Sequence, residues 1–167
     1  KQLCNQSTCG GDRFEFHIKG DSNDVEFYQG YTVTAGGVAS SDTVEHGGHS
    51  IILDIHGSSN TFLGSQRSNN SGHEHSMVTY IYGDSNDIYM RQDSNVSKTM
   101  NLTVNNDTNN IDMVQTGNAA HSATVTVSGS YSTTLDLKQQ GGTAQSYSLS
   151  QSCATVGGCS VSVTQGN

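Results

Sequence analysis

The chain has 167 residues, a formal net charge of −8, 32% hydrophobic residues and no proline. Such an acidic balance argues against nucleic-acid binding, which depends on Lys and Arg, and no apolar run approaches the roughly 20 residues of a membrane-spanning helix. The length is that of one domain, and the hydrophobic content is low for a thick globular core. We therefore expect one thin domain that neither binds nucleic acid nor inserts into a membrane.

The four cysteines form two close pairs, one near each end of the chain. Cys4 and Cys9 belong to an N-terminal segment, residues 1–12, whereas Cys153 and Cys159 lie near the other end. Evenly paired cysteines of this kind fit an oxidising, exported setting. We expect local disulfides Cys4–Cys9 and Cys153–Cys159, and a covalent link from the tail of one subunit to the head of the next stays open as an alternative.

From residue 13 onwards, short segments alternate apolar and polar residues. Alternation with period two predicts a strand that turns one face inward. Segments of one kind are Phe14-Phe16-Ile18, Ile51-Leu53-Ile55, Met77-Thr79-Ile81, Met100-Leu102-Val104, Ala123-Val125-Val127 and Tyr147-Leu149-Gln151. We take these as the first strands of a repeated unit.

Each first strand leads through a tight turn to a second strand. The turns read Gly20-Asp21-Ser22-Asn23, Gly57-Ser58-Ser59-Asn60, Gly83-Asp84-Ser85-Asn86 and Asn106-Asp107-Thr108-Asn109. The second strands read Asn23-Val25-Phe27-Gln29, Asn60-Phe62-Gly64-Gln66, Asn86-Ile88-Met90-Gln92 and Asn109-Ile111-Met113-Gln115, with a degenerate copy at 132–139 and a last one at Val161-Val163-Gln165. Gly, Asp, Ser and Asn are typical turn residues, because they tolerate positive φ or bond to their own backbone.

The units recur at a spacing that settles near roughly 23 residues, which is in the range of a solenoid repeat. An additional Gly-, Ser- and Thr-rich stretch at about 31–48 interrupts the first interval, and we expect an exposed loop or short excursion there. The sequence therefore predicts an all-β solenoid over residues 13–165, with about six stacked strand-turn-strand repeats that form two parallel, in-register sheets.

The repeated amides on the inward face predict a ladder. A buried amide without a partner costs on the order of 1–3 kcal/mol, but amides stacked at the ~4.8 Å spacing of strands satisfy one another. The predicted fibre-core ladder contains Asn23, Gln29, Asn60, Gln66, Asn86, Gln92, Asn109, Gln115, Gln139, Gln151 and Gln165. Such a ladder also fixes the register of the strands.

The unit resembles the curlin repeat, in which Ser, alternating apolar residues, a Gly-containing turn with Asn, and a final Gln follow in order. The residues that carry the resemblance are Ser50, Gly57, Asn60 and Gln66 in one unit and Ser76, Gly83, Asn86 and Gln92 in the next. The chain differs from the family pattern in the turn, where Ser replaces a second Gly, and in its insert, its bulkier core and its cysteines. The resemblance implies secretion, a β-solenoid, and polymerisation into curli, the amyloid fibres of biofilm matrix. It also implies secretion and nucleation proteins as partners.

Other functions are weighed against this one. His49, His75 and His121 each precede a first strand, so we expect them in an outer row near one edge and predict no catalytic site. His73-Glu74-His75 and the acidic turns suit metal ions only weakly, so we predict no metal site and no cofactor. We expect a structural subunit of an extracellular, cell-surface fibre that serves scaffolding and adhesion. It polymerises with itself through strand edges at 13–29 and 147–165. The alternative is a monomeric β-solenoid adhesin or a metal-binding surface protein.

Overall fold

The computed structural model describes residues 11–33, 39–41, 48–68 and 73–166, and these residues form an all-β solenoid. One sheet, here called the first-strand sheet, contains β1 (Arg13–Lys19), β5 (Ser50–His56), β7 (Ser76–Tyr82), β9 (Thr99–Val104), β11 (Ser122–Gly129) and β13 (Ser146–Cys153). The other, the second-strand sheet, contains β2 (Asp24–Gln29), β6 (Thr61–Arg67), β8 (Asp87–Asp93), β10 (Asn110–Gln115), β12 (Thr133–Gln139) and β14 (Cys159–Gln165). The predicted fold class, a solenoid with two parallel sheets, is confirmed.

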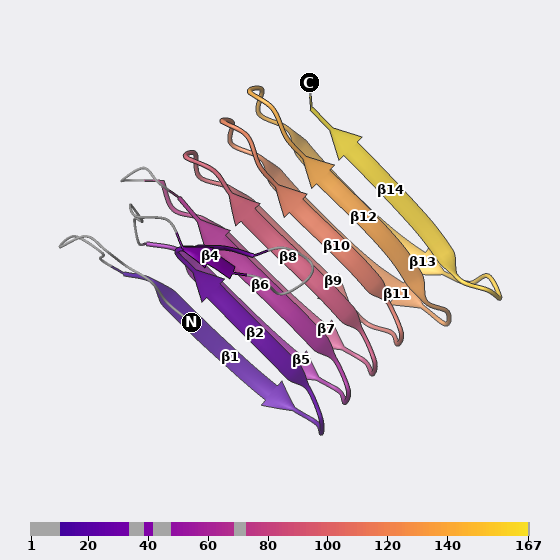
Figure 1. Cartoon of the computed structure of the whole chain (residues 1–167). Helices are drawn as coiled ribbons and strands as arrows, with labels where there is room; N and C mark the ends of the chain where they lie inside the picture. The colour runs from indigo at the N-terminus through magenta and orange to yellow at the C-terminus, as the bar shows by residue number, and fades with distance from the viewer. Residues whose placement is uncertain (1–10, 34–38, 42–47, 69–72, 167) are drawn as a thin grey trace.

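The two sheets lie face to face, and the chain climbs the stack from β1 at one end to β13 and β14 at the other (Figure 1). A first strand and the second strand that follows it are here called a rung. Every pair of neighbouring strands in both sheets is parallel. Equivalent residues therefore stand directly above one another: Ile51, for example, pairs with Met77, and Met77 pairs with Met100.

A tight turn, here called the Gly arc, joins the two strands of a rung. Close contact between neighbouring arcs explains why most of them begin with glycine. A Cβ added to Gly57, whose φ is +156°, would collide with the carbonyl of Gly83 in the next rung. Ser59 and Ser85, each just before the Asn of its turn, adopt φ of 58°. The prediction that these turns contain residues that tolerate positive φ is confirmed.

Inward side chains of both sheets meet in a single narrow core. The middle rungs are sealed, and Ile55, Ile81 and Met90 have no exposed surface. Gly64 occupies an inward position of β6 for lack of space, since a Cβ there would lie 2.8 Å from Phe62 Cε1 and 3.3 Å from Phe27 Cδ1. Two phenylalanine rings, with centroids 5.4 Å apart, thus fill the volume that Gly64 leaves.

The insert between the first two rungs, expected as an exposed loop or short excursion, contains a small two-stranded sheet. β3 (Tyr31–Val33) pairs antiparallel with β4 (Ala39–Ser41), and β3 lies beside β6 and β2. The remaining residues of the insert lie outside the described residues, as do Cys4 and Cys9, so the Cys4–Cys9 bond stays a prediction. Within the described part of the chain, no helix has the length and hydropathy that crossing a membrane requires.

Candidate functional site

A continuous column of glutamine side chains runs through the core of the second-strand sheet. Each Nε2 donates to the Oε1 of the glutamine in the next rung towards the C-terminus. The bonds join Gln29 to Gln66 (3.0 Å), Gln66 to Gln92 (2.9 Å), Gln92 to Gln115 (3.0 Å), Gln115 to Gln139 (2.6 Å) and Gln139 to Gln165 (2.9 Å). The first five of these side chains are fully buried. The column therefore has one direction, from donor to acceptor, along the whole stack.

The same glutamines also tie the two sheets together. Gln66 Nε2 donates to the carbonyl of Ser50 (3.0 Å), and Gln92 Nε2 donates to that of Ser76 (3.1 Å), each at the start of the first strand of its own rung. Gln115 and Gln139 make the equivalent bonds to Thr99 and Ser122. Each amide N–H2 thus uses one hydrogen for the neighbouring rung and one for the return connection. Replacing a glutamine would leave buried groups unpaired in two directions.

Asparagines form a second column at the Gly arc, with the opposite direction. Asn60 donates from both its backbone N (3.0 Å) and its Nδ2 (3.1 Å) to Asn23 Oδ1, and Asn86 and Asn109 repeat the pair of bonds one rung on. Asn60 Nδ2 also donates to the carbonyl of Gly83 (2.9 Å), so it holds the next arc in place. The column ends where Thr133 N donates to Asn109 Oδ1 (2.7 Å).

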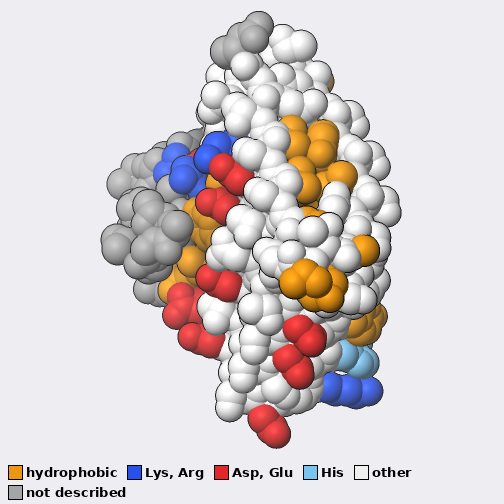
Figure 2. All heavy atoms as spheres, turned by 90° about the vertical axis from the view of Figure 1, so that its right-hand side faces the viewer, with side chains coloured by type: hydrophobic (Ala, Val, Ile, Leu, Met, Phe, Trp, Pro, Cys, Tyr) orange, Lys and Arg blue, Asp and Glu red, His pale blue; other side chains and the backbone are white. Residues whose placement is uncertain are grey.

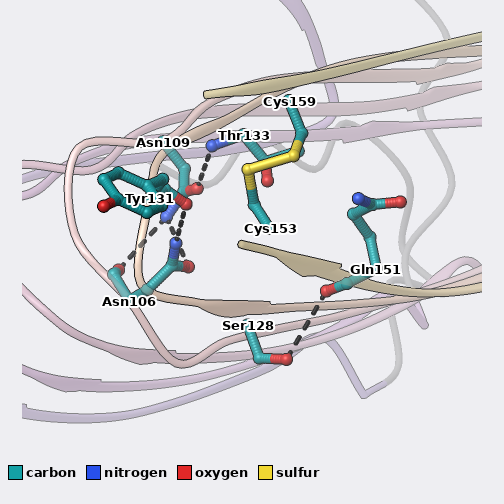
Figure 3. The surroundings of a disulfide bond; sticks show 8 residues. All are labelled: Asn106, Asn109, Ser128, Tyr131, Thr133, Gln151, Cys153 and Cys159. Carbon is teal, nitrogen blue, oxygen red and sulfur yellow. Dashed lines mark hydrogen bonds between the residues drawn. A yellow bond between two sulfur atoms is a disulfide. The ribbon is translucent and has the colours of Figure 1, made fainter. Parts of the chain in front are cut away.

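In the last rung a disulfide lies at the turn between the two strands (Figure 3). Cys153 stands beside Gly129, at the position where other rungs begin the Gly arc, and Cys159 pairs with Thr133, which occupies the Asn position. The predicted Cys153–Cys159 disulfide is confirmed. It joins the Gly position to the Asn position within one rung, whereas Asn23 and Asn60 bond to the Gly carbonyl of the next rung. The terminal arc, which has no rung above it, is therefore closed covalently.

Gln151 was assigned to the ladder, and this was wrong. It lies on β13 and pairs with Val127, so it continues the column of Ile55, Ile81 and Val104 in the first-strand sheet. Its residue type matches the ladder, whereas its position within β13, opposite Val127, matches the aliphatic column. The last rung thus carries an amide where the other rungs carry an aliphatic side chain.

The histidines expected on the outer edge are buried instead. His49, His75 and His121 are at most 2% exposed, and Lys98, which stands at the same position in its rung, is 1% exposed. The imidazoles of His49 and His75 stack with centroids 4.9 Å apart and planes at 7°. We call these four residues the basic column. The signal for it was present, because a basic residue before every one of four first strands is as regular as the glutamines.

Backbone groups fix the roles of the nitrogens in this column. His49 Nδ1 accepts the N–H of His75 (3.0 Å), and His75 Nε2 faces the carbonyls of Arg67 (2.8 Å) and Ser94 (3.2 Å), which requires its proton on Nε2. Lys98 Nζ donates to the carbonyls of Gly117 (3.0 Å) and Ala119 (2.6 Å). These side chains therefore hold the connections between second and first strands in place through hydrogen bonds to their backbone carbonyls.

Burial makes positive charge unfavourable in the basic column. Desolvation, with further repulsion from His49 and Lys98, lowers the pKa of His75 to about 3. Desolvation lowers the pKa of Lys98 to about 8, against the attraction of Asp93. Desolvation and the charge of Lys98 also lower the pKa of His121. At neutral pH, His75 and His121, whose pKa values are both lowered, are therefore uncharged on either side of Lys98.

The two ends of the stack differ from its middle because no described rung covers them. At the first rung, Phe16 is 50% exposed and Ile18 is 43% exposed, although both point along the inward columns. Gln29 Oε1 is buried, and no group of the described residues donates to it. At the last rung, Leu149 and Val163 are partly exposed. These edges, with the ladder between them, are the candidate functional site.

Known proteins give no further guide to this site. Comparisons with protein-family models, with curated proteins and with solved structures gave no match. Among the described residues, no group of three or more His, Cys, Asp and Glu side chains is placed to hold a metal ion. His75 of the His73-Glu74-His75 motif is turned to backbone carbonyls.

Proposed function

We propose that this chain is the structural subunit of an extracellular, amyloid-like fibre, in which copies stack end to end and continue the solenoid from one molecule into the next. Its partner is a second copy of itself, and the fibre acts as a scaffold and an adhesive surface outside the cell. Membership of the curlin family, with its secretion and nucleation proteins and its biofilm matrix, belongs to the same proposal. It rests on the repeat pattern alone.

The directional glutamine ladder is the observation that carries the proposal. It begins with an acceptor, Gln29 Oε1, to which no described residue donates, and it ends with Gln165, for whose Nε2 no acceptor lies among the described residues. Gln29 is fully buried in the single subunit, so docking of a second copy must first uncover it. If a second copy is placed above β14, Gln165 Nε2 of the first copy can donate to Gln29 Oε1 of the second. This bond has the same direction from donor to acceptor as every other bond of the ladder. Joining two like ends would instead set donor against donor or acceptor against acceptor, so the ladder favours head-to-tail addition.

Apolar surface at the ends supports the same junction. Full burial of a side chain such as Phe or Ile is worth about 1.5–3 kcal/mol, and roughly half of that is still to be gained at Phe16 and Ile18. The strand edges of β1 and β2, and those of β13 and β14, have no described neighbour on their outer sides and offer ladder hydrogen bonds to another rung. Open edges of this kind template the addition of further chains.

A monomeric solenoid with a capped C-terminal end is the second candidate, and two features of the last rung favour it. Gln151 would face Ile18 of the next copy, so that an amide would be buried against an aliphatic side chain at some cost. The disulfide-closed arc is also longer than the arcs below it, because Cys153 and Cys159 are six positions apart, whereas Gly83 and Asn86 are three apart.

Sedimentation velocity at increasing concentration, with electron microscopy of the same samples, distinguishes the two. The fibre proposal predicts concentration-dependent growth into filaments with the ~4.8 Å cross-strand repeat. Val163→Lys, which puts a charge into the exposed inward column of β14, should stop growth. Thr164→Lys, on the outward side of the same strand, should not. A monomer that persists at every concentration, or two lysine variants that behave alike, would contradict the proposal.

A further inference from the structure

We propose that the outer face of β9, β11 and β13, together with a cleft at its edge, binds an uncharged polysaccharide. The inference is independent of fibre formation, since the face belongs to a single subunit. Its basis is a change in surface chemistry along the stack, combined with a local break in the repeat.

The outer face of these three strands consists of hydroxyl and amide side chains only. Every outward residue of β9, β11 and β13 is Ser, Thr or Asn. Register sets them in straight rows, of which the two central ones are Asn101–Thr124–Ser148 and Thr103–Thr126–Ser150. Along a row the spacing is that of the rungs, ~4.8 Å, and between rows it is about 6.6 Å.

The outward side chains of β9, β11 and β13 carry no charge, and the one acidic residue of the adjoining cleft is Asp107. Outward positions of the lower strands and of the second-strand sheet carry charges, for example Glu15, Asp54, Arg91, Asp112 and Lys138. Figure 2, which looks onto the Gly arcs, shows acidic side chains on its lower and left-hand parts and none on its upper right-hand part. A protein with a net charge of −8 therefore presents one sheet face whose outward side chains carry no charge. Such a face suits a hydroxylated, uncharged partner and not a polyanion.

Tyrosines border this face on the side of the lower rungs. Tyr80 is 37% exposed and begins the row of Thr103 and Thr126, whereas Tyr82 is 39% exposed and stands beside Asn105. Tyrosine combines an apolar ring face with a polar tip, and the C–H faces of a sugar ring pack on such rings while its hydroxyls bond to Ser, Thr and Asn. The face thus offers both kinds of contact that a sugar chain uses.

The repeat breaks next to these tyrosines and leaves a cleft of about 620 Å³, within the size range of small-ligand sites. In rung five the Gly arc, Gly129 to Thr133, is one residue longer than Asn106 to Asn109 in rung four. Asn106, which stands where the lower rungs have glycine, donates from Nδ2 to the carbonyl of Tyr131 (2.7 Å) and so holds the extended arc (Figure 3).

The cleft joins the hydroxyl face at its edge. Tyr82 and Asn105 line it from the first-strand sheet, and Tyr131, which is 37% exposed, lines it from the extended arc. Thr108 and Ser130 add hydroxyl groups to the wall, and Asp107 adds one carboxylate, whose Oδ1 accepts the backbone N–H of Asp84 (2.8 Å). We infer that a sugar unit sits in the cleft between tyrosines while the rest of an uncharged chain lies across the rows of Thr and Ser.

The test is retention on microcrystalline cellulose, an uncharged and insoluble hexose polymer, measured with monomeric Val163→Lys protein so that assembly plays no part. The wild-type face should bind equally at about 50 and about 500 mM NaCl, because contacts without charge are not screened. Tyr82→Ala/Tyr131→Ala should lower retention at least about tenfold, or roughly 1.4 kcal/mol. Thr126→Lys, which places a charge in the middle of the face, should lower retention to a similar extent. This variant tests the role of the face even if the double variant fails to fold.

Matched controls lie on the opposite sheet. Tyr28→Ala on β2 and Thr164→Lys on β14 remove or add the same groups away from the face and should leave retention unchanged. Absence of retention would overturn the inference, as would retention that falls with salt, equal loss in the control variants, or preference for the polyanion alginate over cellulose.

Discussion

The basic column makes the stability of the solenoid sensitive to acid. His75 is 1% exposed, and burial holds its pKa at about 3 in the folded protein, against 6.5 for an ordinary histidine. Between these two values the unfolded chain binds a proton that the folded chain does not. Stability is therefore full above pH 6.5 and falls as the pH drops towards 3.

The expected size follows from the linkage relation. One pKa unit corresponds to about 1.4 kcal/mol, so lowering the pH from 6.5 to 4.5 should cost about 3 kcal/mol through His75 alone. His121 adds to this loss, because its pKa is also lowered by burial and by the charge of Lys98, so acid favours the unfolded chain there too. A typical domain has only 5–15 kcal/mol in total, so the loss should be a large fraction of the whole.

Urea denaturation of the monomeric Val163→Lys protein at pH 7.0 and pH 4.5, followed by circular dichroism, measures this loss. Carboxylates also titrate in this range, so the informative quantity is the difference between variants. His75→Gln, which copies the residue that the last rung carries at this position, Gln145, should shrink the gap between the two pH values by about 3 kcal/mol. His17→Gln removes an exposed imidazole from β1 and should leave the gap as it is. If His75→Gln keeps the full gap, the buried histidine does not carry the acid sensitivity and the reasoning is wrong.

Three further predictions concern stability at neutral pH, all read as urea midpoints of the same monomer. Gln92→Ala removes one rung of the ladder and its bond to Ser76, so it should cost about 2–4 kcal/mol, and an effect below about 1 kcal/mol would show that the ladder is incidental. Gly64→Ala should cost about 1–3 kcal/mol by forcing Phe62 aside, whereas Gly142→Ala, which meets no atom within 4 Å, serves as its control; equal effects would contradict the packing argument. Cys153→Ala/Cys159→Ala removes the disulfide that closes a short loop, and it should lower the free energy of unfolding by about 2 kcal/mol. Reductant should lower the urea midpoint of the parent protein but not that of this variant, and an equal effect of reductant on both would contradict the assignment.

The sequence predicted the parts of the fold that repeat. Alternation with period two and a fixed Gln at the end of each second strand determine both which face is inward and the register, because a slip by one residue would expose the apolar set and misplace the amide. That is why the ladder from Gln29 to Gln139 and the position of Gln165 follow from reading the chain.

Predictions failed at residues whose type suggests one location and whose position in the strand register gives another. Gln151 has the residue type of the ladder but the strand position of an aliphatic column, and only the pairing with Val127 reveals it. The histidines are polar residues at an inward position, and burial becomes affordable only because backbone carbonyls at Arg67 and Ser94 face His75 there. The extended arc at Tyr131 depends on one added residue and on its hydrogen bond with Asn106, and the period of the repeat predicts neither.

The most direct test of the central claim, that each subunit has two complementary open ends, uses two blocked variants. Phe16→Lys spoils the first rung and leaves the last intact, whereas Val163→Lys spoils the last rung and leaves the first intact. By sedimentation velocity, each variant alone should remain a monomer, and an equimolar mixture should form a dimer and stop there, because only one pair of good ends exists. A mixture that stays monomeric, or one that grows into filaments, would contradict head-to-tail stacking.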